Sequence, residues 1–398
     1  MSLLSVEQAL DRLLAWAERT RISDSESLPL AQADGRVLAE SLLAVQDLPP
    51  WDNSAMDGYA LRLADWRGEP LPVSQRILAG ATPAPLRAGT CARIFTGAPL
   101  PPGADCVEMQ ENTELVDDGR VRFLEALRPR RNIRPRGQEA QAGETVLAAG
   151  ARLGPIELGL AASLGVAALP VRRRPRVALL STGDELVEPG QPLGPGQIYN
   201  SNRALLVGWL KRLGCEVRDA GILADDLEAT RVALAGLEQV DLILSTGGVS
   251  VGEADFLGQV LREAGELELW KLAIKPGKPL TCGQYRDVPV IGLPGNPAST
   301  LVTFGMLVRP YLLRRLGVEA VEPLGIEVPA GFAWERATSR REYLRARLER
   351  GRVVPHANQS SGVLRSASWA DGLAEVRENS TFDAGAPVRF IPFSELLN

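Results

Sequence analysis

The chain has 398 residues, of which 45% are hydrophobic and 23% are charged. At ~100–200 residues per domain, this length predicts two to four domains, and the composition leaves no large segment that must be disordered. The formal net charge of −5 argues against general nucleic-acid binding, which requires a basic surface, although local basic patches can still hold small anions.

The cysteine and histidine contents exclude several kinds of site. The four cysteines are far apart and include no C-x-x-C pair, so neither a disulfide framework nor a zinc site is indicated, and a reducing compartment fits. The one histidine, His356, excludes a His-based zinc cluster, and its segment VVPHANQ is typical of a surface turn. With no signal-peptide pattern and no apolar run of ~18 residues, we expect a cytoplasmic protein without a membrane span.

The first part of the chain combines helical patterns with short β-like runs. Ser5 followed by Gln8 matches a capping box, and the apolar positions that follow at helical spacing predict an amphipathic helix. In residues 47–134, runs such as VSQRIL, CARIF and VRFLEA alternate with Gly, Pro and Asp, which predicts an inserted all-β domain. A short strand and a helix started by Pro155 follow, so residues 1–46 and 135–172 are predicted to form one discontinuous mixed domain.

Residues 173–318 alternate apolar strands, glycine-containing loops and helices. Segments such as RVALLSTGDEL and DLILSTGGVSVG predict a mostly parallel sheet covered by helices on both faces, which makes a three-layer α/β domain. Residues 319–398 return to short alternating runs such as REYLRARL and APVRFIPF, which predict a C-terminal β-barrel-like domain. The predicted fold class is therefore α/β multidomain.

Candidate binding loops follow the strands of the predicted parallel sheet. Ligands bind at the carboxyl ends of such strands, where loops lead into helix N-termini. The loop STGGVS suits an anion because adjacent glycines let backbone amides approach it and hydroxyls add donors, although a tight structural turn remains the alternative. The candidates from this loop and from LPGNP are Thr246, Gly247, Gly248, Ser250, Pro294, Gly295, Asn296 and Pro297.

Three carboxylates are predicted at strand ends of the same sheet. Glu185, Asp225 and Asp255 can converge on a hard cation such as Mg²⁺ that bridges phosphate oxygens, because converging like charges would otherwise repel. The alternative is that these residues are solvated loop acids or helix N-caps.

A basic segment, KLAIKPGKPL, holds Lys271, Lys275 and Lys278. A Pro-Gly turn holds the last two lysines close together, and three ammonium groups beside a phosphate-type crevice make an oxyanion pocket. A surface basic turn is the alternative. Together with the carboxylates, this pattern suits a reaction that joins or cleaves two anions.

Taken in order, eight segments resemble the motif series of the MoeA and gephyrin E-domain family, the molybdopterin molybdenumtransferases. The resemblance spans nearly the whole chain, and the most specific pieces are DNSAMDGYA, KPGKP and LPGNP in this order and spacing. The eight segments are DNSAMDGYA, RIFTGAPLPPGAD, NIRPRG, STGDEL, GQIYNSN, STGGVSVGEADF, KLAIKPGKP and GLPGNPAS.

The resemblance implies a homodimer in which the α/β domain of one subunit and the β-insert of the other share an active cleft. It implies that adenylylated molybdopterin and molybdate give molybdenum cofactor and AMP, with Mg²⁺. Asp57 and Thr96 would come from the second subunit and act with Glu185, Asp225 and Asp255 of the first. The implied molybdate-binding residues are Lys275, Lys278, Arg340 and Ser361, and other proteins of the cofactor pathway are possible partners.

The chain departs from the family pattern at one place. Many members have the tetrad Arg-Gly-Glu-Asp, whereas this chain has Arg136, Gly137, Gln138 and Glu139, which displaces the last carboxylate by about one methylene. Two other functions remain as alternatives, a molybdopterin adenylyltransferase and a non-catalytic gephyrin-like scaffold. The sequence does not distinguish molybdate from tungstate and does not identify a single general base.

Overall fold

The computed structural model describes residues 3–247 and 256–397. By its internal contacts the chain divides into two compact units. The first is formed by Met1–Ala39, Gly150–Gly154 and Pro170–Asn398, and the second by Glu40–Ala149 and Pro155–Leu169. The finer division into four domains stays a prediction. In the described part of the chain, no helix has the length and apolar character needed to cross a membrane.

The centre of the first unit is a six-stranded sheet with the order β16-β13-β17-β21-β20-β18. The first four strands in this order pair in parallel, whereas β20 pairs antiparallel with both β21 and β18. The predicted mostly parallel sheet therefore carries an antiparallel edge, which is common in α/β folds. The strands are β13 (Arg176–Thr182), β16 (Glu216–Leu223), β17 (Leu242–Thr246), β18 (Gly265–Lys271), β20 (Pro279–Tyr285) and β21 (Val288–Leu293).

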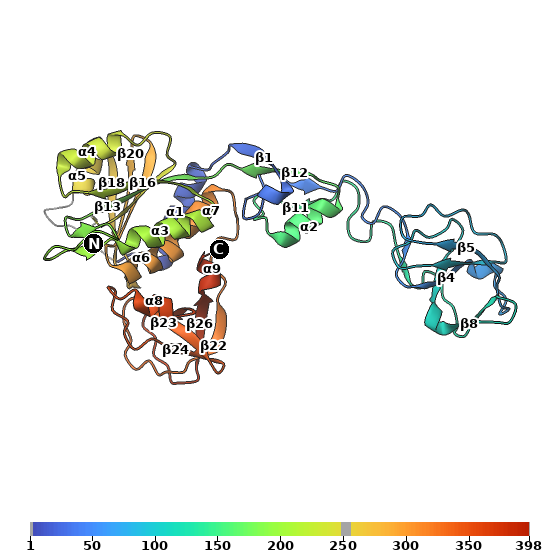
Figure 1. Cartoon of the computed structure of the whole chain (residues 1–398). Coiled ribbons are helices and arrows are strands. Elements are labelled where there is room, and N and C mark those ends of the chain that lie inside the picture. Colours follow the sequence, from blue (N-terminus) through green and yellow to red (C-terminus); the bar gives the residue numbers. More distant parts are fainter. Residues whose placement is uncertain (1–2, 248–255, 398) are drawn as a thin grey trace. The chain divides into compact units, whose positions relative to one another are not determined.

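Helices cover both faces of this sheet, as the apolar strands predicted (Figure 1). Successive side chains of a strand point to opposite faces, so Val177 and Leu179 join one core cluster while Ala178 and Leu180 join the other. The first cluster includes residues of α1, α3, α6 and α7, and the second includes residues of α4 and α5. These helices are α1 (Val6–Arg19), α3 (Ser201–Arg212), α4 (Leu227–Ala235), α5 (Phe256–Ala264), α6 (Pro297–Thr303) and α7 (Arg309–Arg315).

Helix α1 begins at the predicted capping box. The Ser5 hydroxyl accepts the Gln8 N–H at 3.1 Å, and the Gln8 side chain accepts the Ser5 N–H at 3.0 Å. The helix packs on α7, where the Trp16 and Tyr311 rings lie 5.5 Å apart. A π-helical turn, Phe304–Val308, joins α6 to α7. The remaining short strands of this region are β1 (Ser25–Pro29), β12 (Ala168–Arg172), β14 (Leu186–Val187) and β15 (Ile198–Tyr199).

The C-terminal part of the first unit is a small barrel-like β structure, as predicted. Its sheet has the order β19-β23-β25-β26-β22, and β24 also pairs with β23. A bridge between Ala330, just after β22, and Val353 of β24 brings the two ends of the sheet together. The elements are β19 (Ile274–Lys275), β22 (Ile326–Pro329), β23 (Arg341–Glu349), β24 (Arg352–Pro355), α8 (Arg365–Trp369), β25 (Gly372–Val376), β26 (Pro387–Pro392) and α9 (Phe393–Leu397).

The second unit is mainly β structure. A four-stranded sheet with the order β5-β6-β4-β7 lies at its centre, with Tyr59 and Leu61 of β4 on one core cluster and Ala60 on the other. Shorter pairs are β8–β9, β10–β3 and β11–β2. The elements are β2 (Leu42–Leu43), β3 (Asn53–Ser54), β4 (Gly58–Leu61), β5 (Val73–Ile77), β6 (Cys91–Ile94), β7 (Cys106–Met109), β8 (Thr113–Leu115), β9 (Val121–Phe123), β10 (Ile133–Arg134), β11 (Thr145–Leu147) and α2 (Pro155–Ser163).

The buried strand β17 gives a direct test of this core. Leu244 is fully buried there, so Leu244→Ala should lower the free energy of unfolding by ~2–5 kcal/mol through lost apolar burial and a residual cavity. Val232→Ala on α4 is the matched control, because Val232 is 64% exposed and should change stability by less than ~0.5 kcal/mol. Urea unfolding followed by tryptophan fluorescence measures both, and equal effects of the two substitutions would contradict the assigned core.

Candidate functional site

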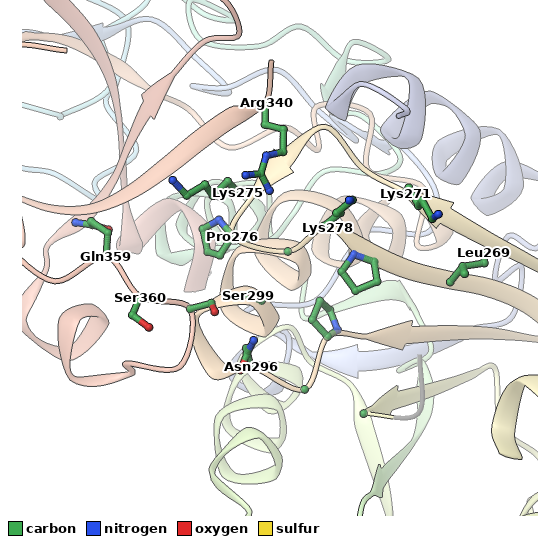
Figure 2. A pocket seen from close by; sticks show the side chains of 16 residues that line it. Leu269, Lys271, Lys275, Pro276, Lys278, Asn296, Ser299, Arg340, Gln359 and Ser360 are labelled. Atoms are coloured by element: carbon green, nitrogen blue, oxygen red, sulfur yellow. The ribbon is translucent and has the colours of Figure 1, made fainter. Parts of the chain in front are cut away.

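A cavity of about 920 Å³ lies in the first unit, where the loops after β17 and β21 meet the lysine segment 271–279 and loops of the C-terminal barrel (Figure 2). Nine of the residues that line it were candidates from the sequence: Gly247, Lys271, Lys275, Lys278, Pro294, Gly295, Asn296, Arg340 and Ser361. Seven were not: Leu269, Pro276, Gly277, Pro279, Ser299, Gln359 and Ser360. The structure therefore brings the predicted loop, lysine and C-terminal residues to one cavity.

The lysine segment reaches the cavity by a tight turn. Strand β18 ends at Lys271, β19 covers Ile274–Lys275, and β20 begins at Pro279, so Pro276 and Gly277 form the turn between two strands. Gly277 has a φ of 115°, and a Cβ there would lie 2.5 Å from the Thr303 side chain of α6. Glycine is required at this position because the turn lies directly against the helix.

Strand pairing joins this segment to the barrel. Ile274 and Lys275 of β19 pair in parallel with Arg341 and Glu342 of β23. The Lys275 ammonium lies 3.0 Å from the Glu342 carboxylate, whose side chain is only 3% exposed, and Figure 2 shows Lys275 beside Arg340. Within the described part of the chain, Lys271 and Lys278 have no such carboxylate partner, so the cavity has an excess of positive charge.

The loop LPGNP is held rigidly at the opposite wall. The Asn202 side chain on α3 donates to the Gly295 carbonyl at 2.7 Å, and the Thr300 hydroxyl donates to the Pro294 carbonyl at 2.6 Å. Asn296 is the N-cap residue of α6. Pro297 is the first residue of that helix and Thr246 the last of β17, so both adjoin the cavity residues without lining the cavity.

Acidic side chains gather at the carboxyl ends of β13 and β16, outside the cavity lining. The Asp225 N–H donates to the Asp184 carboxylate at 3.0 Å. Burial, together with the negative charges of Asp184 and Glu185, raises the pKa of Asp225 above its ordinary value. Two of the three predicted metal ligands, Glu185 and Asp225, are therefore close enough for their charges to interact, but no three carboxylate, histidine or cysteine side chains of the described residues form a group that could hold a metal ion. The third, Asp255, lies outside the described residues, as do Gly248 and Ser250.

Asp57 and Thr96 belong to the second unit and form a pair there. The Asp57 carboxylate accepts the Thr96 N–H at 2.8 Å and the Thr96 hydroxyl at 2.7 Å. These hydrogen bonds, with a smaller contribution from the Arg93 charge, hold the pKa of Asp57 below its ordinary value. Asp57 is thus an ionised, oriented carboxylate at neutral pH.

The departure at Gln138 and Glu139 lies in the same unit. The Glu139 backbone N–H donates to the Leu48 carbonyl at 2.8 Å, and the Glu139 side chain is exposed. Nearby, the Arg136 side chain pairs with Asp47, and its backbone N–H donates to Asp52 at 2.8 Å. The loop is therefore held by Arg136 and the two aspartates, and the longer Glu139 side chain is not part of that hydrogen bonding.

Thiol chemistry has no place at the cavity. All four cysteines are free and buried, and burial raises the pKa of the Cys91 thiol to about 12 and that of Cys215 to about 12. His356 lies in the loop after β24 and is half-buried against the Trp369 ring, and its ring nitrogen accepts the Asn358 N–H at 3.0 Å. The groups available for chemistry are therefore lysine and arginine donors, hydroxyls, backbone amides and carboxylates.

A compositional signal marks the lysine segment more strongly than its motif does. The chain contains only four lysines, Lys211, Lys271, Lys275 and Lys278, and three of these lie in this one segment. Elsewhere, apart from Lys211, the chain uses arginine for positive charge. Lysine is a compact, flexible ammonium and arginine a planar fork, so this local preference indicates a site that requires point charges.

The sequence contains no comparable pattern that would predict the other polar residues of the cavity. Ser299, Gln359 and Ser360 are ordinary polar residues of a helix and a loop, and only the packing of α6 against the barrel makes them neighbours.

The fold and site together define an α/β protein with a lysine-lined cavity between its central sheet and a C-terminal β structure. Residues 4–165 match the family described as MoeA N-terminal region (domain I and II), residues 178–314 the probable molybdopterin binding domain, and residues 327–393 the MoeA C-terminal region (domain IV).

Relatives and solved structures agree with these matches. The chain is 38% identical to the molybdopterin molybdenumtransferase of Haemophilus influenzae, over 99% of this chain and 100% of that one. It is 37% identical to molybdopterin molybdenumtransferase 2 of Mycobacterium tuberculosis, over 91% and 93% of the two chains. A crystal structure of a MoeA protein from Pyrococcus horikoshii matches with a TM-score of 0.82 and 27% identity, covering 98% of this chain and 100% of that one. This chain belongs to the MoeA family of molybdopterin molybdenumtransferases.

The Asp57–Thr96 pair can be tested by titration. Thr96→Val removes the hydroxyl donor but keeps the backbone N–H, so the pKa of Asp57 should rise part of the way to its ordinary value. A carboxyl whose folded pKa is depressed stabilises the fold above its unfolded pKa and loses that contribution as the pH falls through the folded value. NMR titration of the Asp57 carboxyl carbon measures the shift. Thr113→Val, also in the second unit, is the control, and an unchanged Asp57 pKa in Thr96→Val would contradict the assignment.

Proposed function

We propose that this chain transfers molybdenum from molybdate to adenylylated molybdopterin, with release of AMP, as a step in molybdenum cofactor biosynthesis. The observation that carries the proposal is the cavity in which Lys271, Lys278 and Arg340 meet the glycine loop and the LPGNP loop. Molybdate is a tetrahedral dianion, and a cluster of cationic donors can hold it by charge-assisted hydrogen bonds. The cavity lies at the carboxyl edge of the sheet, where α/β proteins bind phosphate-containing ligands.

The opposite charges of the lysine cavity and of the carboxylates at the ends of β13 and β16 support a reaction between anions. The lysine cavity attracts an oxyanion, whereas the carboxylates at the ends of β13 and β16 repel one another and favour a cation. An anhydride whose phosphate lies between the two regions would meet positive charge from both a bound cation and the lysines. Molybdenum from molybdate would then bind the two pterin thiols, whose protons leave with one molybdate oxygen as water, and water would cleave the anhydride to release AMP.

We propose Mg²⁺ as the cation. Glu185 and Asp225, with Asp255, would hold it, and the raised pKa of Asp225 fits a cluster of carboxylates that a divalent cation would neutralise. When bound, Mg²⁺ would neutralise charge on the phosphate oxygens. The protein's own contribution would be to orient these oxygens through the three lysines, because the Gly247 N–H donates to the Leu293 carbonyl at 3.3 Å within the sheet.

We also propose that the working protein is a homodimer with a shared site. The ionised Asp57 carboxylate is oriented by Thr96 in the second unit, whereas every described residue that lines the cavity belongs to the first. A second copy of the chain would supply the Asp57–Thr96 pair to the cavity of the first copy.

The oxyanion role of the lysines predicts a selective loss of activity. Lys278→Met should lower AMP release from adenylylated molybdopterin, in the presence of molybdate and Mg²⁺, by about tenfold or more, because one charge-assisted hydrogen bond contributes ~1.5–3 kcal/mol. The control is Lys211→Met, which removes the fourth lysine, an exposed residue in the last turn of α3. AMP is measured by chromatography, with tungstate in a parallel series to establish oxyanion preference.

Two outcomes of this assay would contradict the proposal. Wild-type protein that releases no AMP when molybdate is added would exclude the reaction. Equal release by Lys278→Met and Lys211→Met would exclude the cavity as its place. Formation of adenylylated molybdopterin from ATP and molybdopterin would instead favour an adenylyltransferase.

The shared site predicts complementation between inactive chains. Asp57→Ala and Asp255→Ala should each be inactive alone, but hybrid dimers of the two contain one intact site and should recover up to about half of the activity of an intact dimer. Co-expression with two affinity tags isolates the hybrids, and the AMP assay measures them. Hybrids that form and remain inactive would show that both residues act within one chain.

A further inference from the structure

A buried arginine, Arg345, contacts the loop of residues 359–361, here called the serine loop, which lines the cavity. Arg345 lies on β23, is only 1% exposed, and is among the largest fully buried side chains of the described residues. Its Nε donates to the Ser366 hydroxyl at 3.1 Å, and its Nη2 donates to the Ser360 carbonyl at 3.1 Å. Ser360 and its neighbours Gln359 and Ser361 line the cavity.

The charge of Arg345 has no carboxylate partner, unlike the charges of two partly buried arginines of the barrel. Arg341 pairs with Glu7 and Glu378, and Arg389 pairs with Glu375, whereas no carboxylate of the described residues lies within 4 Å of Arg345. Burial lowers the pKa of Arg345 to about 10, so the group still carries its charge at neutral pH. Burying a charge without a counterion lowers the free energy of unfolding, which indicates a functional role for Arg345.

The serine loop is attached to Arg345 by its backbone as well. The Gln359 side chain accepts the Arg345 N–H at 3.0 Å and donates to the Arg345 carbonyl at 2.9 Å. At the other end, the Ser361 carbonyl accepts the Ala298 N–H of α6 at 2.9 Å. The loop thus has a fixed position between β23 and α6, and Figure 2 shows Gln359 and Ser360 on the barrel side of the cavity, with Ser299 of α6 nearby.

The planar peptide between Ser360 and Ser361 determines the direction of the Ser361 N–H. Among the described residues the cis peptide bonds are those before Pro49 and Pro276, so the Ser360–Ser361 bond is trans, and its N–H points opposite to its C=O. Because Arg345 holds the Ser360 carbonyl, the Ser361 N–H points away from Arg345. In the described part of the chain this N–H has no acceptor, while Ser361 itself lines the cavity.

We propose that Arg345 is a positioning residue of the oxyanion site. Its buried guanidinium holds the Ser360 carbonyl, and through the planar peptide it orients and polarises the Ser361 N–H as a donor to a tetrahedral oxyanion in the cavity. The inference rests on the proposed binding of molybdate there. A cation on the carbonyl side strengthens the N–H as a donor because hydrogen bonds in a chain polarise one another, and a charged partner makes the bond shorter and stronger.

Direct molybdate binding to the full chain tests the role without requiring turnover. By equilibrium dialysis, Arg345→Gln, which keeps a neutral donor, should weaken molybdate binding by about threefold to tenfold, and Arg345→Met by about tenfold or more. Arg345→Lys keeps the charge and should recover most of the affinity. The control is Arg347→Met on the same strand, because the Arg347 guanidinium stacks 4.5 Å from the Trp369 ring and Arg347 does not line the cavity.

Thermal unfolding of each variant separates positioning from general support of the barrel. We expect the loss of molybdate affinity in Arg345→Gln at temperatures where it is fully folded, with Arg347→Met unchanged within about twofold. Wild-type affinity in folded Arg345→Gln and Arg345→Met would overturn the inference and leave the proposed function standing. A wild-type chain that binds no molybdate would overturn the proposed function, and this inference with it.

Discussion

The candidate site depends on one short parallel pairing, in which β19 of the lysine segment adds to β23 of the C-terminal barrel. Its register places Lys275 opposite Glu342, and the Arg341 N–H donates to the Ala273 carbonyl at 2.8 Å. On its other side, the same segment is held by Leu4, whose N–H donates to the Lys271 carbonyl at 2.9 Å. The lysines therefore have a fixed position between the central sheet and the barrel, and Arg340 and Ser361 can line the same cavity.

Several charged side chains near this pairing have no partner of opposite charge among the described residues. Lys275 has a buried carboxylate partner, whereas Lys271, Lys278 and the buried Arg345 have none among the described residues. At the ends of β13 and β16 the imbalance is of the opposite sign, and it raises the pKa of Asp225. Both imbalances cost stability in the free protein and can be relieved by a ligand of the right charge, which is a usual feature of binding sites.

Much of the fold follows from local patterns. The capping box at Ser5 and Gln8 starts α1, and the continuous apolar run from Val177 to Leu180 predicts a strand buried on both faces, because both patterns arise within a few residues. The antiparallel edge of the sheet was not predicted. Strand β18 precedes the KPGKP turn and pairs antiparallel with β20, which follows it. A Pro-Gly turn by itself does not determine which of the flanking residues pair.

The sequence by itself determined the candidate residues of the site: the glycine loop at Gly247, the LPGNP loop, and three of the chain's four lysines. Their residue types and their places after strands are local properties. Only the tertiary structure decided that Gln359, Ser360 and Ser299 share their cavity, and that Arg345 stands behind it. These neighbours come from elements far apart in the sequence, and their proximity depends on how the barrel packs on α6 and on the register of β19 with β23.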